Sequence, residues 1–366
     1  MKPQRLTLAL VLALAPLPAL ADSAPSDCDR LAGYPSAPRV PGAGGVAYVL
    51  DPAAAIEACN SELAATPADP YLRLQLANAL LAADIDDPRA ATLFEGLRDS
   101  LPAMARLRLG ALTEGGAGGI YADADAARVL YEEGCAMNDQ PGAMAACSNL
   151  ALLMITQGAA DEIPRALSLY EAACAAEDMG ACINLGVEYE YGDNVAQDTA
   201  RAQALYRQAC DGGDPLGCAN LGNGIVSGWA DGTAEEATGL FRQACAMGEV
   251  QACSDLGVSY AQGEGVAVDA SVAAMFYGMA CEGGSALGCA NLAEAYRDGK
   301  GVPQDPARAM TLMAEACDGE EGWGCLMQAE ALQTQGGFPA DAPLVLALLD
   351  RGCALGEAAA CRPGAE

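Results

Sequence analysis

The sequence has 366 residues, 16 cysteines, no histidine and a formal charge of −30. Such a strongly negative field repels phosphate groups, so binding to nucleic acid or to anionic lipid is disfavoured. The lack of histidine excludes every catalytic triad and every zinc site that needs an imidazole. Aromatic residues are only 5% of the chain. Alanine and leucine must then supply most of the apolar surface, which favours closely packed helices.

The first 21 residues predict a secretory signal peptide. Lys2 and Arg5 precede an apolar run from Leu6 to Leu14, prolines follow at 16 and 18, and Ala19-Leu20-Ala21 has the small residues of a cleavage site. The prolines end the run well short of the ~20 residues that a membrane span needs. We therefore expect cleavage after Ala21 and a periplasmic or extracellular location without a membrane span. The mature chain would have 17 basic and 49 acidic residues, a charge of −32.

The next 100 residues contain no regular cysteine pattern. Residues 22–50 include several Pro and Gly and predict an irregular segment, whereas 69–83 and 102–116 have the apolar pattern of helices. Asp-Pro pairs predict further helix starts, because aspartate caps a helix and proline suits its first position. These pairs stand at 51/52, 69/70, 87/88, 214/215 and 305/306.

The last two thirds of the chain consists of internal repeats. Fourteen cysteines fall into seven pairs, and the second members of these pairs follow one another at steps of 35 or 36 residues. A period of this length indicates a solenoid of small supersecondary units. The second members are Cys147, Cys182, Cys218, Cys253, Cys289, Cys325 and Cys361.

Each repeat has the pattern of a helical hairpin. In the unit from 253 to 281, Leu256, Gly257 and Tyr260 share a helical face, and Gly263 then ends the helix. Asp269 is the expected N-cap of a second apolar helix. Small residues recur on the first helix, where we expect them to let neighbouring helices approach closely; they are Gly186, Gly222, Gly257 and Ala293.

One repeat carries a recognisable motif, NLGxxYxxGxGVxxDxxxA, which runs with some variation from Asn291 to Ala309. It resembles the Sel1-like repeat, a relative of the tetratricopeptide repeat. With its cysteine pairs, the region from Tyr121 to Cys361 is similar to the cysteine-rich Sel1 proteins that Helicobacter secretes. The copy at 218–245 departs at Ile225, and the copy at 325–353 lacks the GxGV turn.

The resemblance implies an all-α, right-handed α-solenoid of Sel1-like and tetratricopeptide-like hairpins stapled by disulfides. We divide the chain into a signal peptide (1–21), an irregular segment (22–50), tetratricopeptide-like units (51–120) and the cysteine-rich array (121–366).

Geometry favours disulfides between sequence neighbours. Positions eight apart in a continuous helix are separated by ~12 Å, beyond the ~4.4–6.8 Å Cα range of a disulfide, so the chain must turn between them. The alternative, such as Cys182 with Cys210, leaves Cys135 and Cys361 without partners. The expected pairs are Cys28–Cys59, Cys135–Cys147, Cys174–Cys182, Cys210–Cys218, Cys245–Cys253, Cys281–Cys289, Cys317–Cys325 and Cys353–Cys361.

The candidate binding residues are asparagines that recur two positions after the second cysteine, namely Asn149, Asn184, Asn220 and Asn291. They either contact a peptide on the concave face of the solenoid or form capping and inter-repeat hydrogen bonds. Three tyrosines that also recur in phase, Tyr189, Tyr260 and Tyr296, are interpreted as packing between repeats.

No catalytic residue, metal site or cofactor is predicted. The resemblance implies a penicillin-binding protein or weak β-lactamase, but a serine β-lactamase uses an S-x-x-K motif. The single lysine of the mature chain is Lys300, and Arg297 precedes it by three residues. An EF-hand loop needs a glycine at its sixth position and a glutamate at its twelfth, and neither of the acidic stretches 84–87 and 123–125 is followed by both.

We therefore expect a scaffold that binds a protein or peptide with basic patches, and not nucleic acid. The alternatives are β-lactam binding or hydrolysis and a passive envelope-maintenance factor. The sequence does not indicate an oligomeric state.

Overall fold

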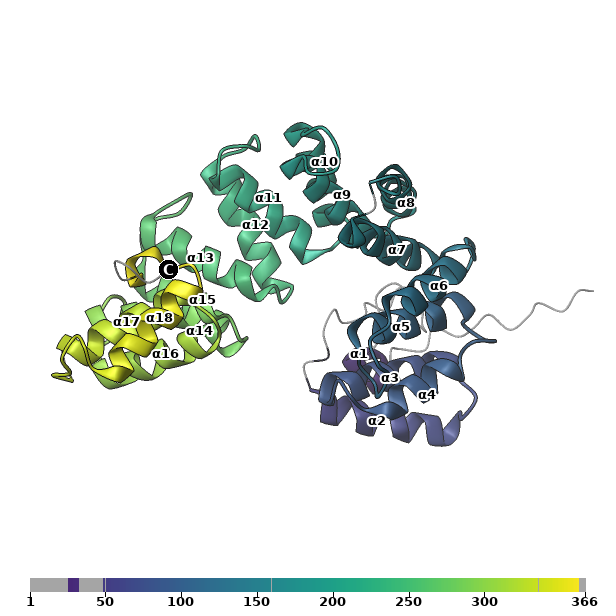
Figure 1. Ribbon diagram of the computed structural model, residues 1–366, viewed down its shortest axis with the longest axis horizontal. Helices are drawn as coiled ribbons and strands as arrows, with labels where there is room; N and C mark the ends of the chain where they lie inside the picture. The colour runs from purple at the N-terminus through teal and green to yellow at the C-terminus, as the bar shows by residue number, and fades with distance from the viewer. Residues whose placement is uncertain (1–25, 33–48, 50, 159, 335, 362–366) are drawn as a thin grey trace, which may run out of the picture. The chain divides into compact units, whose positions relative to one another are not determined.

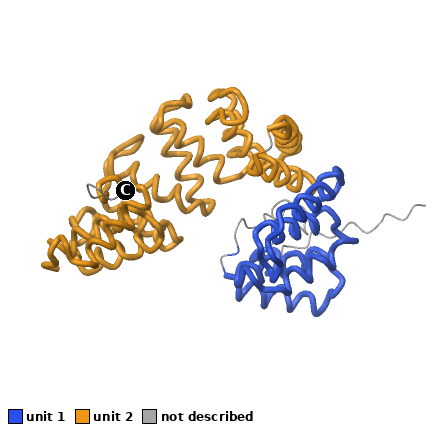
Figure 2. The backbone as a smooth tube through the Cα atoms, viewed as in Figure 1, with its two compact units in different colours: residues 1–142 blue, residues 143–366 orange. Residues whose placement is uncertain are grey.

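The computed structural model describes residues 26–32, 49, 51–158, 160–334 and 336–361. The expected signal peptide (1–21) lies outside these residues. The described part of the chain contains 18 α-helices, a 3-10 turn and no β-strand (Figure 1). It divides into two compact units, Met1–Gly142 and Ala143–Glu366 (Figure 2), which we describe separately.

Unit 1 is built on a core of long aliphatic and aromatic side chains. Leu72, Phe94, Leu109 and Tyr131 are fully buried within it or nearly so. Its helices are α1 (Asp27–Ala32), α2 (Pro52–Ala65), α3 (Pro70–Ala83), α4 (Pro88–Glu95), α5 (Pro102–Gly115) and α6 (Ala124–Cys135).

Helix α1 lies in the segment 22–50, for which the sequence predicted irregular structure. It is fixed to the rest of unit 1 by the Cys28–Cys59 disulfide. The buried Gln75 on α3 also donates a hydrogen bond of 3.0 Å from Nε2 to Oδ1 of Asp29. These contacts are with residues 31 and 46 positions away, so local Pro and Gly content gave no sign of them.

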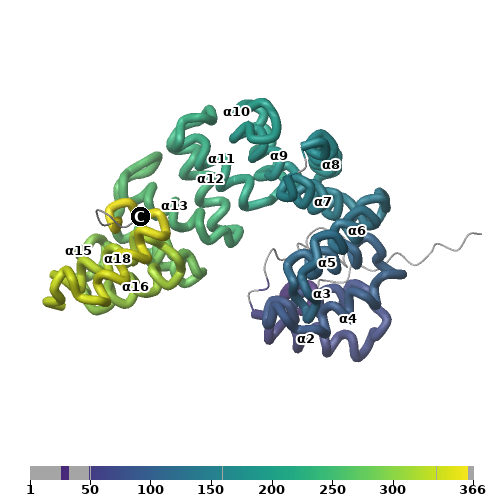
Figure 3. The backbone as a smooth tube through the Cα atoms, in the orientation of Figure 1, coloured from purple at the N-terminus to yellow at the C-terminus, as the bar shows by residue number. Residues whose placement is uncertain are grey.

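Unit 2 is a succession of helical hairpins, traced from teal to yellow in Figure 3. Its first helices are α7 (Ala143–Gln157), α9 (Met179–Tyr191), α11 (Pro215–Val226), α13 (Val250–Gln262), α15 (Ala286–Asp298) and α17 (Gly322–Thr334). Its second helices are α8 (Ile163–Ala175), α10 (Thr199–Asp211), α12 (Ala234–Ala246), α14 (Ala270–Glu282), α16 (Pro306–Asp318) and α18 (Pro343–Ala354), with η1 (Ala358–Ala360) at the end. The predicted all-α solenoid of hairpins is confirmed.

The first helices form the inner side of the unit 2 solenoid. Neighbouring first helices touch, α7 with α9, α9 with α11, α13 with α15 and α15 with α17. The second helices of neighbouring hairpins make no comparable contact in the described part of unit 2. A stack of hairpins that is closer together on one side curves toward that side, so the first helices line its concave face.

The predicted aspartate caps are present. The carboxylate of Asp69 accepts hydrogen bonds from the backbone N–H groups of Tyr71 and Leu72, and Asp269 does the same for Ser271 and Val272. Each such cap stabilises its helix by about 1 kcal/mol. Asp51, Asp87, Asp214 and Asp305 also cap the helices that follow them.

All 16 cysteines are disulfide-bonded. Six of the bonds join cysteines eight residues apart with Cα–Cα distances of 4.5–4.7 Å, which is the local pairing. Cys135 and Cys147 are bonded as well, and no described cysteine is free. Most of these staples tie the last turn of a second helix to the start of the next first helix. Such bonds are typical of proteins that reside outside the reducing cytosol.

Aromatic rings from the second helix pack against the small residues on the first helix of the same hairpin. A Cβ at Gly186 would lie 2.6 Å from Cε1 of Tyr206, and a Cβ at Gly257 would lie 2.6 Å from Cδ1 of Tyr277. Ala293 stands at this position in the next hairpin, where the buried partner is Met313 rather than an aromatic residue. Close approach of the two helices therefore depends on small first-helix residues, as predicted.

Candidate functional site

The four candidate asparagines lie at one position of successive first helices. Asn149 is on α7, Asn184 on α9, Asn220 on α11 and Asn291 on α15, and each side chain is half-buried. The same position on α13 is Asp255, also half-buried. We call these five residues the inner row.

Asn291 makes a hydrogen bond between repeats. Its Nδ2 donates to Oγ of Ser254 on α13, at 3.2 Å. This is one of the two roles expected of the asparagines. The side chains of Asn149, Asn184 and Asn220 have no hydrogen-bond partner among the described residues, so their amides keep donors and acceptors for another molecule.

Asp255 is the site residue that the sequence reasoning missed. Its Oδ1 accepts a hydrogen bond from Nε2 of Gln251 at 3.4 Å, and its Oδ2 is buried without a partner among the described residues. Burial raises the pKa of this carboxyl to about 6, and the charge of Glu249 acts in the same direction. The signal that could have found Asp255 was its position two residues after Cys253, rather than its residue type.

Apolar side chains stand beside the inner row on the first two helices of unit 2. Leu152 follows Asn149 by three residues and Val187 follows Asn184 by three, so each pair shares a helical face. Leu152 is 42% exposed and Val187 is 36% exposed. The inner face at α7 and α9 therefore combines amides with exposed apolar groups.

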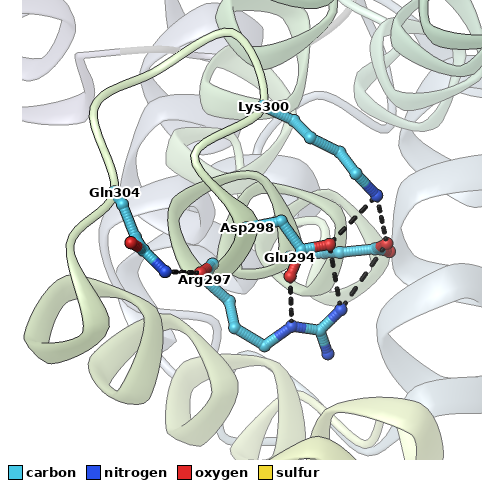
Figure 4. Close-up of polar contacts among 5 residues, drawn as sticks. All are labelled: Glu294, Arg297, Asp298, Lys300 and Gln304. Carbon is cyan, nitrogen blue, oxygen red and sulfur yellow. Dashed lines mark hydrogen bonds and ion pairs between the residues drawn. The ribbon is translucent and has the colours of Figure 1, made fainter.

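Lys300 belongs to a group of four charged side chains at the C-terminal end of α15 (Figure 4). Its Nζ lies 3.2 Å from Oε1 of Glu294 and 3.0 Å from Oδ2 of Asp298. Arg297 donates from Nε to Oδ1 of Asp298 at 2.7 Å, and this bond holds the pKa of Asp298 at about 2. Hydrogen bonding to Asp298 raises the pKa of Lys300. These contacts thus favour the protonated form of the Lys300 amine.

One cluster has the spacing of metal ligands. Donor atoms of Cys281, Cys289 and Glu315 lie within 4.8 Å of one another. The two sulfur atoms are joined in a disulfide, so they do not offer the thiolates that a metal would bind.

The in-phase tyrosines take part in packing. Tyr260 stacks on Phe276 of α14 with ring centroids 5.8 Å apart. Tyr189 is buried, with the guanidinium of Arg201 4.3 Å from its ring centroid. Tyr296 is half-buried against the core of α14, α15 and α16.

Known proteins resemble this chain in sequence pattern and in fold. The Sel1 repeat model matches residues 103–139, 145–178, 180–214, 250–285 and 286–320. The unmatched stretches 215–249 and 321–366 contain the two copies that depart from the motif, 218–245 and 325–353. No curated protein matches the chain, and no described helix has the length and apolarity to cross a membrane.

Among solved structures, a protective antigen of uropathogenic Escherichia coli with an SLR fold is similar, with a TM-score of 0.54 and 17% identity. The alignment covers 83% of this chain and 65% of that one, so this chain spans less than two thirds of that protein. A Sel1 repeat protein from Oxalobacter formigenes has a TM-score of 0.49 at 20% identity, covering 80% of this chain and 98% of its own. With its repeating motif, stacked hairpins and five matched segments, the chain belongs to the Sel1 repeat proteins.

Proposed function

We propose that unit 2 is a scaffold that binds an extended segment of another polypeptide along the inner row. The observation that carries this proposal is that three asparagine side chains in one row lack hydrogen-bond partners. Asn149, Asn184 and Asn220 occupy one position on consecutive first helices, are half-buried, and have no hydrogen-bond partner among the described residues. Amide donors and acceptors that have no partner in the chain remain open to another molecule, so a row of them on a concave face suits a ligand that pairs them.

The spacing of the row suits a peptide main chain. Packed helices lie about 8–10 Å apart, and an extended chain advances about 3.3 Å per residue. One amide would therefore meet about every third residue of the ligand. An amide both donates and accepts, as a peptide group does, so such contacts give affinity without reading the ligand's side chains.

The apolar residues next to the row support the same function. Leu152 and Val187 are exposed beside Asn149 and Asn184, and they offer an apolar surface for side chains of the bound segment. The disulfides and the expected signal peptide suggest that this ligand is met in the periplasm or outside the cell.

The test is selection of peptides from a random display library with the oxidised full-length chain, followed by calorimetry on the selected peptides. Asn184→Ala should weaken binding about 5- to 30-fold, the effect of losing one or two hydrogen bonds of about 1 kcal/mol each. The triple variant Asn149→Ala, Asn184→Ala, Asn220→Ala should bind no selected peptide measurably.

The matched control is Gln243→Ala, which removes an exposed amide from the second helix α12 and should leave affinity unchanged. Failure to select any peptide, or wild-type affinity in the triple variant, would refute the proposed function.

A further inference from the structure

Asp255 places a carboxylate where the other four members of the inner row have an amide. Within the described residues it has no basic partner, and its Oδ2 has no hydrogen bond. Its single side-chain hydrogen bond, from Gln251, is long at 3.4 Å. The carboxylates of Glu294 and Asp298 differ, because Arg297 and Lys300 pair with both of them.

The missing partner of Asp255 has an explanation in the repeat. Asn291 is satisfied by the hydroxyl of Ser254, which directly follows the second cysteine of the preceding repeat. One repeat earlier, the residue that directly follows the second cysteine is Ala219, which is buried. At this register a methyl group stands where a hydroxyl would donate a hydrogen bond, so the neighbouring repeat offers Asp255 no equivalent partner.

The first helices α11 and α13 are also packed less closely against each other than other neighbouring first helices. The first helices α13 and α15 touch, and so do α9 and α11, whereas α11 and α13 make at most a weaker contact. Asp255 is half-buried on α13 and its Oδ2 is enclosed, so a ligand on that face has access to the exposed part of the residue rather than to Oδ2.

A carboxylate in this place is more costly to bury than an amide, because its charge loses hydration without a compensating partner. Residues that break a local pattern at such a cost are concentrated at functional sites. An ionised carboxylate only accepts hydrogen bonds, and its strongest partners are ammonium and guanidinium groups.

We propose that Asp255 forms a subsite for a lysine or arginine side chain of the bound polypeptide segment. This inference rests on the proposed function and names the chemistry of its ligand. Asn220 precedes Asp255 along the row, so the basic residue follows the main-chain contacts that the three unpaired asparagines would make. The formal charge of −30 on the whole chain attracts such a ligand at long range.

A double-mutant cycle tests the subsite. Peptides selected with the wild-type chain should share a lysine or arginine at one position. Replacing that residue with neutral citrulline or norleucine should weaken binding to the wild type about 10-fold or more, and binding to Asp255→Asn less than 2-fold. Raising the salt concentration should reduce the first effect and leave the second unchanged.

Glu282→Gln is the matched control, since it removes one exposed carboxylate from the second helix α14 and should leave the peptide's charge preference intact. Selected peptides without a shared basic residue, or equal losses in wild type and Asp255→Asn, would overturn the subsite and leave the scaffold standing. If no peptide is selected at all, the proposed function itself is wrong and the subsite falls with it.

Discussion

Replacing Asp255 with asparagine should stabilise unit 2 at neutral pH. Burial first, and the charge of Glu249 in addition, raise the pKa of this carboxyl from its ordinary 3.8 to about 6. Because a shift of one pKa unit is worth about 1.36 kcal/mol, the carboxylate costs the folded state at most about 3 kcal/mol once it is ionised. The other four positions of the row show that the fold accepts an amide there.

The direction of the pH dependence follows from the raised pKa. The contribution of Asp255 to stability is full below pH 3.8, where the carboxyl is protonated in both folded and unfolded chains, and is lost as the pH rises through about 6. The advantage of Asp255→Asn should therefore be absent near pH 3.5 and reach about 1–3 kcal/mol above pH 7.

Repeat arrays unfold in segments, so the measurement is hydrogen exchange of the α13 amides in both chains between pH 4 and pH 8, under non-reducing conditions. Direct titration of the Asp255 carboxyl by NMR gives an independent value of its pKa. An asparagine variant that is less stable at pH 7, or whose advantage does not depend on pH, would refute this account of the buried charge.

Three further changes test the packing, the staples and the repeat register. Gly257→Ala should destabilise its hairpin by about 1–3 kcal/mol in denaturant titrations, because the added methyl group overpacks against the ring of Tyr277. Gly278→Ala should be neutral or stabilising, because no atom lies within 4 Å of the added Cβ. Equal effects of the two changes would contradict the packing argument. Removing the Cys210–Cys218 disulfide by replacing both cysteines with alanine should cost about 2–3 kcal/mol, seen as faster hydrogen exchange in α10 and α11, and unchanged exchange there would contradict a stabilising staple. Ala219→Ser should supply the hydroxyl that Asp255 lacks and lower the pKa of its carboxyl in an NMR titration; an unchanged pKa would show that the register argument is wrong.

Much of the fold could be predicted because its signals are local or periodic. The aspartates before proline cap helices as their chemistry predicts, and the regular cysteine spacing indicated both the hairpins and their pairing. Helix α1 was not foreseen, because it depends on Cys59 and Gln75, both distant in sequence. A segment whose order comes from distant partners carries no sign of it in its own composition.

The candidate site was predicted only in part for a related reason. The phase of the asparagines located the inner row, but the search followed residue type, so Asp255 at the same phase was passed over. What makes Asp255 different also lies outside its own helix. For Asn291 the partner is Ser254, the residue after the cysteine of the preceding repeat, whereas alanine at that place has no hydroxyl to offer Asp255. Ser148 stands at the equivalent place before Asn184 without bonding to it, so a serine there is not sufficient by itself.

The position of the staples explains how unit 2 can carry an unfavourable group on its inner face. In the five repeats that contribute to the inner row, the second cysteine lies two residues before the inner-row residue, so the disulfide fixes the helical turn that presents it. Fixing that turn before binding lowers the entropy cost of holding a ligand. At α13 the Cys245–Cys253 disulfide contributes about 2–3 kcal/mol by loop closure, comparable with the cost of at most about 3 kcal/mol for ionised Asp255. The stabilisation by this disulfide thus offsets the free-energy cost of the ionised carboxylate two residues away. The charge of Asp255 is then available to the basic ligand that we propose.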